Sequence, residues 1–99
     1  TPDKTEAALL RLTETPAVRS MSARSAARLD RIMPMVLAAC EGDDATLARW
    51  IDLLAAIAGR TSYLALLAER PATIQRVHRL LCASAWLART LTESPILLD

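Results

Sequence analysis

Histidine and cysteine are the residue types in this chain best suited to chemistry. His78 and Cys82 lie four residues apart, which on a helix is the spacing of two metal ligands or of a thiol–imidazole pair. A zinc site needs three or four ligands, yet the chain has one histidine, and Cys40 falls in a different predicted helix. No orienting acid accompanies the pair. With Ile74 and Leu81 flanking it, we interpret His78 as a core-edge residue, and we predict no catalytic or metal-binding residue.

Two adjacent carboxylates, Asp43 and Asp44, are the other candidates for metal chemistry. Nucleotidyl transfer needs carboxylates aimed at one ion, which alternate residues of a strand achieve and adjacent residues do not. These two residues precede a predicted helix, where an aspartate is a preferred cap. The two glycines are too far apart to form a phosphate-binding loop. We predict no cofactor-binding residue.

Arg24, Arg28 and Arg31 form a basic strip along one predicted helix, at spacings of four and three. Such a strip could hold phosphates or an acidic partner. Asp30 is adjacent and no aromatic residue interleaves, so a solvated helix face is the simpler interpretation. If the strip has a function, a contact with a protein partner or a neighbouring domain fits better than nucleic acid.

The elements that must position these side chains are helices. The 99-residue chain is 53% hydrophobic, contains no Phe, and is rich in Ala and Leu, which favour helix strongly. Few β-branched or aromatic runs remain to form strands. We predict an all-α single domain over residues 1–99, a compact bundle of five to seven helices. Trp50 and Trp86 are interpreted as core anchors and not as ligand platforms, and the last helix is expected to bury either Trp86 or Leu87, together with Leu91.

Apolar spacing and capping residues give the helix boundaries. The predicted helices cover residues 2–14, 22–41, 45–58, 62–69, 71–83 and 84–92, with a short turn or helix over 15–21. Thr1 and Pro2 begin the first helix, and Gly42 ends the long one. Pro34 lies inside the long helix, so either that helix kinks or two helices meet there. A kink is favoured because the apolar face continues in phase.

Charge and cysteine usage indicate the setting of the protein. The formal net charge is +1, so no strong field points to nucleic acid or to an anionic membrane. Two cysteines do not make a disulfide framework, and we expect free thiols in a reducing cytoplasm. No signal peptide begins the chain, and no uncharged apolar run approaches ~20 residues. We predict a soluble, cytoplasmic protein.

The last residues, 95–99, read Pro-Ile-Leu-Leu-Asp, which resembles the opening of a further apolar segment. The chain therefore reads as a fragment of a larger, multidomain protein. A set of residues before this end keeps a characteristic order and spacing: Arg60, Tyr63, Leu64, Leu67, Glu69, Pro71, Ser84, Leu87, Ala88 and Leu91. Upstream, residues 27–34 read Ala-Arg-Leu-Asp-Arg-Ile-Met-Pro.

Together these motifs resemble the bacterial family of bifunctional glutamine synthetase adenylyltransferase/adenylyl-removing enzymes. The family-like region is 22–99, and residues 1–20 match weakly. The resemblance implies a parent enzyme with two nucleotidyltransferase domains, each followed by helical domains. One half attaches AMP from ATP with magnesium to glutamine synthetase, and the other removes it. Glutamine and the PII signal protein set the balance. This segment would lie in the central helical region, between the two halves.

The family's catalytic signature, Asp-x-Asp on a strand, has no match in this sequence. No catalytic, ATP or magnesium residue is therefore carried over, and the segment itself is predicted not to be an enzyme although its parent is. The matched Arg60, Tyr63 and Glu69 are interpreted as structural, with a contact to a neighbouring domain as the alternative.

Three functional hypotheses follow. The first is a noncatalytic helical connector that spaces and couples the two nucleotidyltransferase domains. The second is a regulatory module that binds glutamine or PII, using His78, Tyr63 or the basic strip. The third is an unrelated helical adaptor or DNA-binding domain, for which the Gln75, Arg76 and Arg79 surface is a weak match. Neither nucleic acid nor a membrane is expected as a partner.

Overall fold

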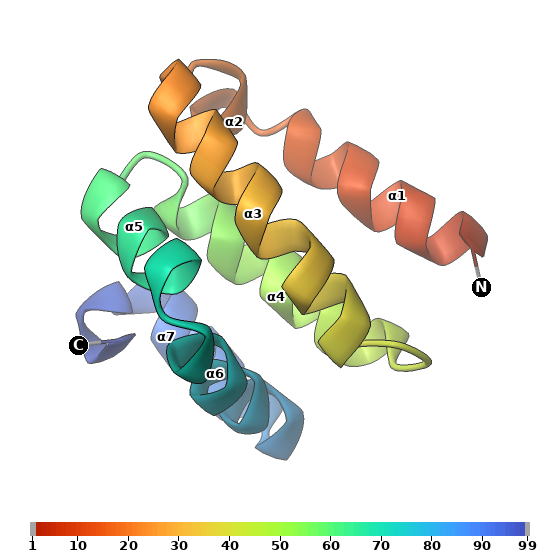
Figure 1. Ribbon diagram of the computed structural model, residues 1–99. Helices are drawn as coiled ribbons and strands as arrows, with labels where there is room; N and C mark the ends of the chain where they lie inside the picture. Colours follow the sequence, from red (N-terminus) through yellow and green to blue (C-terminus); the bar gives the residue numbers. More distant parts are fainter. Residues whose placement is uncertain (1, 99) are drawn as a thin grey trace.

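The helices occur along the chain in the order that the sequence predicts. The computed structural model describes residues 2–98, with side chains from residue 5 to residue 96. Over that range it contains seven α-helices, a closing 3-10 helix and no strand, which confirms the all-α prediction (Figure 1). The elements are α1 (Pro2–Thr13), α2 (Pro16–Arg19), α3 (Ala23–Ala39), α4 (Asp44–Ile57), α5 (Thr61–Glu69), α6 (Pro71–Ala83), α7 (Ala85–Glu93) and η1 (Pro95–Leu98).

Local capping explains most of these boundaries. Ser22 accepts a hydrogen bond from the backbone of Ser25 at the start of α3, and Ser84 does the same for two amides of α7. Pro71 occupies the first position of α6, where a missing amide hydrogen costs nothing. Gly42 follows α3 with φ of 80°, a left-handed conformation that disfavours side chains. The predicted cap at Thr1 lies outside the described residues.

Pro34 lies inside one continuous helix. The segment Ala23–Ala39 is not divided at this residue, so the alternative of two helices meeting there is wrong. The buried stripe explains this continuity, because Leu29, Ile32 and Val36 stay on one face on both sides of the proline. A kink at Pro34 stays a prediction.

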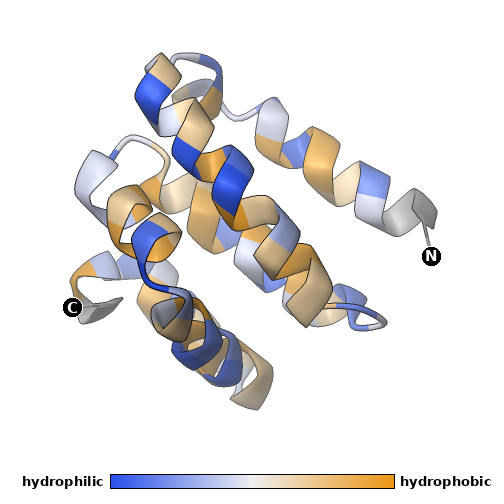
Figure 2. Cartoon of the chain, viewed as in Figure 1, coloured by the Kyte–Doolittle hydropathy of each residue, from blue (hydrophilic) through white to orange (hydrophobic). Residues whose placement is uncertain are grey.

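Helix α4 is the centre of the fold. It packs against α1, α6 and α7, and α3 packs across α5 and α6. Trp50, Leu53, Leu54 and Ile57 of α4 are fully buried. Buried hydrophobic residues of the surrounding helices form one core cluster with those of α4. Hydrophobic and hydrophilic residues alternate along most helices, as expected for elements with one buried face (Figure 2). Helix α1 and the closing 3-10 helix η1 lie on opposite sides of the view in Figure 1.

Only one of the two tryptophans is a core anchor. Trp50 is completely buried, as the sequence predicts, but 65% of Trp86 is exposed, so the prediction of a second anchor is wrong. Helix α7 instead buries Ala88 and Leu91. Trp86 precedes Ala88 by two residues, which is ~200° around a helix of 3.6 residues per turn, so it lies on the outer face. Within the described chain, no helix combines the length and apolar character needed to span a bilayer.

Candidate functional site

His78 lies where three helices meet. It projects from α6 and is half-buried, and its Nδ1 accepts a hydrogen bond from the indole Nε1–H of Trp50 on α4, at 3.1 Å. Cys82 Sγ lies 3.3 Å from Nε2, and Cys40 Sγ, from the end of α3, lies 3.9 Å from Nδ1. The packing therefore gathers the single histidine, both cysteines and the buried tryptophan around one imidazole.

The Trp50 hydrogen bond determines the protonation of this ring. An indole nitrogen only donates, so Nδ1 must carry a lone pair, and the proton of neutral His78 sits on Nε2. Nε2–H then donates towards Cys82 Sγ and has no lone pair to receive a thiol proton. The imidazole is consequently arranged to hold α4 and α6 together, and not to act as a general base for Cys82.

Asp43 performs the capping role that the sequence predicts for one of the two adjacent aspartates, and Asp44 is the first residue of α4. Its Oδ1 accepts from the Thr46 amide at 3.0 Å, and its Oδ2 accepts from the Thr46 hydroxyl at 2.7 Å. These bonds favour the carboxylate, and the hydroxyl bond is the main reason that the pKa of Asp43 is lowered. Thr46 Oγ1 also lies 3.7 Å from Cys82 Sγ, which joins the cap to the histidine cluster.

Both cysteines are free thiols in different surroundings. Burial raises the pKa of Cys40 to about 12, with smaller contributions from the Asp43 carboxylate and from Cys82. Cys82 is exposed. In the described part of the chain, no group of three or more metal-ligating side chains is arranged to hold an ion.

The basic strip is divided by its environment. Arg28 is half-buried and its Nη1 donates to the Thr61 carbonyl at 3.5 Å, which links α3 to the start of α5. Arg24 and Arg31 are exposed, and within the described residues neither makes a hydrogen bond or ion pair. The strip therefore supplies one structural tether and two free guanidinium groups.

The polar family-matched residues in and beside α5 are Arg60, Tyr63 and Glu69, and the first two of them are in contact. The Arg60 guanidinium lies 5.8 Å from the centroid of the Tyr63 ring, a cation–π arrangement within the first turn of α5. Tyr63 is half-buried against the core, whereas Glu69 is exposed at the other end of the helix. An interdomain role for Arg60, Tyr63 and Glu69 stays a prediction.

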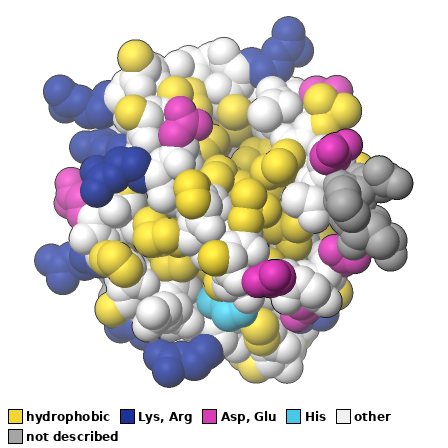
Figure 3. Space-filling view, turned by 45° about the vertical axis from the view of Figure 1, so that its right-hand side comes forward, with side chains coloured by type: hydrophobic (Ala, Val, Ile, Leu, Met, Phe, Trp, Pro, Cys, Tyr) yellow, Lys and Arg dark blue, Asp and Glu magenta, His cyan; other side chains and the backbone are white. Residues whose placement is uncertain are grey.

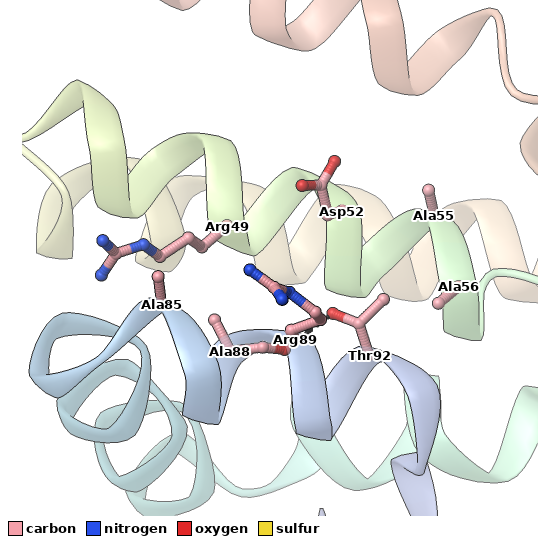
Figure 4. A pocket seen from close by; sticks show the side chains of 8 residues that line it. All are labelled: Arg49, Asp52, Ala55, Ala56, Ala85, Ala88, Arg89 and Thr92. Atoms are coloured by element: carbon pink, nitrogen blue, oxygen red, sulfur yellow. Dashed lines mark hydrogen bonds between the residues drawn. The ribbon is translucent and has the colours of Figure 1, made fainter.

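Two of the surface grooves were not predicted from the sequence as grooves, although one of them includes His78, Gln75 and Arg79. One, of about 630 Å³, runs between α4 and α7 and is floored by alanines, with Arg49, Asp52 and Arg89 along its walls (Figure 4). Arg49 is already engaged, since it donates to the Leu81 carbonyl, and Asp52 pairs with Arg11 at 3.7 Å. The other, of about 500 Å³, lies between α3 and α6.

The sequence pointed to neither groove, nor to the Trp50–His78 bond. Each depends on which helix faces come together, and the only local signal was the four-residue spacing of His78 and Cys82. Cys40 and His78 are 38 residues apart and meet through packing alone.

Comparison with known proteins gives a consistent result. The bifunctional glutamine synthetase adenylyltransferase/adenylyl-removing enzyme of Nitrosococcus oceani is 43% identical over 99% of this chain and 10% of its own length. The enzymes of the same description from Bordetella pertussis and Aromatoleum aromaticum are 45% and 53% identical, over 92% and 73% of this chain. The chain spans about a tenth of the length of these relatives. No protein-family model and no solved structure matches it.

Proposed function

Since this chain is homologous over nearly its whole length to a segment of the bifunctional glutamine synthetase adenylyltransferase/adenylyl-removing enzymes, we propose that it is a noncatalytic helical connector of such an enzyme. In this role it spaces the two nucleotidyltransferase domains and couples their activities. The parent would use ATP and Mg²⁺, modify glutamine synthetase and work in the cytoplasm.

The helical packing supports this proposal. The core closes around α4, and the imidazole of His78 ties α6 to α4 through Trp50. Arg28 ties α3 to α5 in the same way. Because these contacts hold the helices together, the domain would move as one rigid unit and would keep the chain segments on either side of it at a fixed distance. A spacer between two catalytic domains requires this rigidity.

A chimaera tests the connector role. The matching tenth of the Nitrosococcus oceani enzyme is replaced by this chain, and attachment and removal of AMP on glutamine synthetase are measured with and without glutamine. We expect the chimaera to retain both activities, and we expect the two activities to respond in opposite directions to glutamine. The 99-residue chain alone, supplied with ATP, Mg²⁺ and glutamine synthetase, is expected to transfer no AMP, and transfer by it would refute the proposal.

The two free guanidinium groups favour a second candidate, a regulatory module that binds PII or glutamine. Arg24 and Arg31 are exposed and unpaired among the described residues, so they are available to a partner. Replacing both with Glu should abolish binding of PII to the chain while leaving its thermal stability nearly unchanged, because neither side chain is packed. Unaltered binding would remove this candidate.

A further inference from the structure

The groove between α3 and α6 combines an apolar floor with one arginine, Arg79, on its α6 wall. Its volume is about 500 Å³, and it is lined by Met35, Ala38, Ala39, Pro71, Ile74, Gln75, His78 and Arg79. Met35 is a flexible side chain that adapts to different apolar partners. Arg79 is exposed on the α6 wall.

The α3 wall continues the groove into the basic strip. Arg31 precedes Met35 by four residues and Ala38 follows it by three, so the three side chains share one flank of the helix. Arg24 and Arg28 extend the same flank towards α5. An occupant of the apolar floor would therefore have the free guanidinium group of Arg79 beside it, and that of Arg31 within reach one turn beyond the lining of α3.

Charge on these two helices is strongly unbalanced. Helices α3 and α6 hold five arginines and a single carboxylate, Asp30, a net of +4 in a chain whose total is +1. In Figure 3, most basic side chains lie along the left edge and most acidic ones lie towards the right, with hydrophobic side chains between them. Such a surface attracts an acidic partner and repels a basic one.

We propose that the α3–α6 groove docks an amphipathic helix that inserts apolar side chains between Met35 and Ile74 and directs carboxylates at Arg31 and Arg79. A helix fits because it satisfies its own backbone hydrogen bonds, whereas the helical walls offer no free backbone groups to an extended strand. The lining from Pro71 to Arg79 spans about 12 Å, at 1.5 Å per residue, so the contact covers just over two turns.

Two other occupants fit the groove less well. A second copy packing symmetrically through the same face would place one basic surface against another, and this repulsion opposes a dimer. Single-stranded nucleic acid binds through large aromatic platforms, and no Phe, Tyr or Trp side chain lines this groove. An acidic helix satisfies both the apolar floor and the charge.

The test is an amide NMR titration of the 99-residue chain with designed helical peptides. One peptide carries leucines at helical spacing with glutamates beside them, and its matched control carries lysines in place of the glutamates. We expect shifts confined to α3 and α6 with the acidic peptide only. Equal binding of both peptides, shifts centred on another face, or no binding of the acidic peptide at millimolar concentration would overturn the proposal.

Charge-reversal variants assign the contact. Arg31→Glu with Arg79→Glu should weaken acidic-peptide binding at least tenfold. Arg19→Glu with Arg89→Glu makes the same change in net charge on other helices and should weaken it less than threefold. Ala38→Trp, which fills the groove from an exposed position, should also abolish binding. Equal losses in the two charge variants would show a nonspecific field effect and refute the site.

This proposal and the connector role fail separately. AMP transfer by the isolated chain would refute the connector and leave the groove untouched, whereas peptide titration addresses the groove alone. Shifts of the same α3 and α6 amides by an RNA or DNA oligonucleotide, with none from the acidic peptide, would replace the helical occupant by a nucleic acid. If the chain dimerised and Ala38→Trp abolished the dimer, the occupant of the groove would be a second copy of this chain and not an acidic helix.

Discussion

The hydrogen bond from Trp50 to His78 can be tested by replacing the tryptophan with phenylalanine. Trp50→Phe keeps an aromatic ring in the core. Among the described residues, it removes the one donor to His78 Nδ1 apart from the weak thiol of Cys40, which lies 3.9 Å away. Because the bond joins α4 to α6, its loss should lower the free energy of unfolding of the whole domain.

Two terms give the magnitude. Leaving a buried acceptor unpaired costs ~1–3 kcal/mol, and the lower part of that range applies because His78 is only half-buried. The smaller ring leaves a gap at a position with no exposure, which adds about 1 kcal/mol. We therefore expect Trp50→Phe to destabilise the protein by about 2–3 kcal/mol.

The chain offers a matched control in Trp86→Phe. Trp86 is 65% exposed and makes no side-chain hydrogen bond among the described residues, so the same substitution there should change stability by less than about 0.5 kcal/mol. Both variants are measured by urea unfolding followed by far-ultraviolet circular dichroism, with linear extrapolation to water. Nitrogen-15 NMR of the imidazole reports the tautomer directly.

The reasoning would be refuted by either of two results. If Trp50→Phe were no more destabilising than Trp86→Phe, the indole could not be an anchor linked to His78. If neutral His78 carried its proton on Nδ1 in the unmodified protein, the bond from Trp50 would not exist as described.

Three further predictions concern single residues. The pKa of Asp43 is lowered from its usual 3.8, so the contribution of this carboxylate to stability is present above that pH and is lost as the pH falls through the lowered pKa. Asp43→Asn, which can still cap the helix, should therefore flatten the acid side of a curve of stability against pH. An unchanged acid side would contradict this prediction. A chromogenic disulfide reagent should modify exposed Cys82 quickly and buried Cys40 only on unfolding. Fast labelling that remained in the Cys82→Ser variant would contradict the burial of Cys40. Gly42→Ala should cost about 1–2 kcal/mol in thermal unfolding because φ is 80°, whereas Gly59→Ala should be neutral or stabilising; equal effects would refute the strain argument.

Helix positions were predictable because their signals are local. The caps at Ser22, Asp43 and Ser84 act within three residues, and Pro71 and Gly42 impose backbone angles on themselves. The apolar stripes of α3, α4 and α6 also follow from helical spacing alone. The relationship to the adenylyltransferase family was likewise present in the order of residues.

Contacts between helices were not predictable, because they depend on which faces meet. The sequence treats Trp50 and Trp86 alike, and only the packing of α1, α6 and α7 on α4 buries the first and leaves the second exposed. The same packing brings Cys40 to His78 across 38 positions.

The sequence by itself therefore determined an all-helical chain, the extent of most helices and its kinship. The tertiary structure decided that Arg28 is a tether while Arg31 is free, and that the basic strip borders an apolar groove with α6. Helical spacing determines which side chains share one face of a helix. Whether a side chain is buried or paired depends also on the face of the second helix that packs against it. That second face is supplied only when the chain folds.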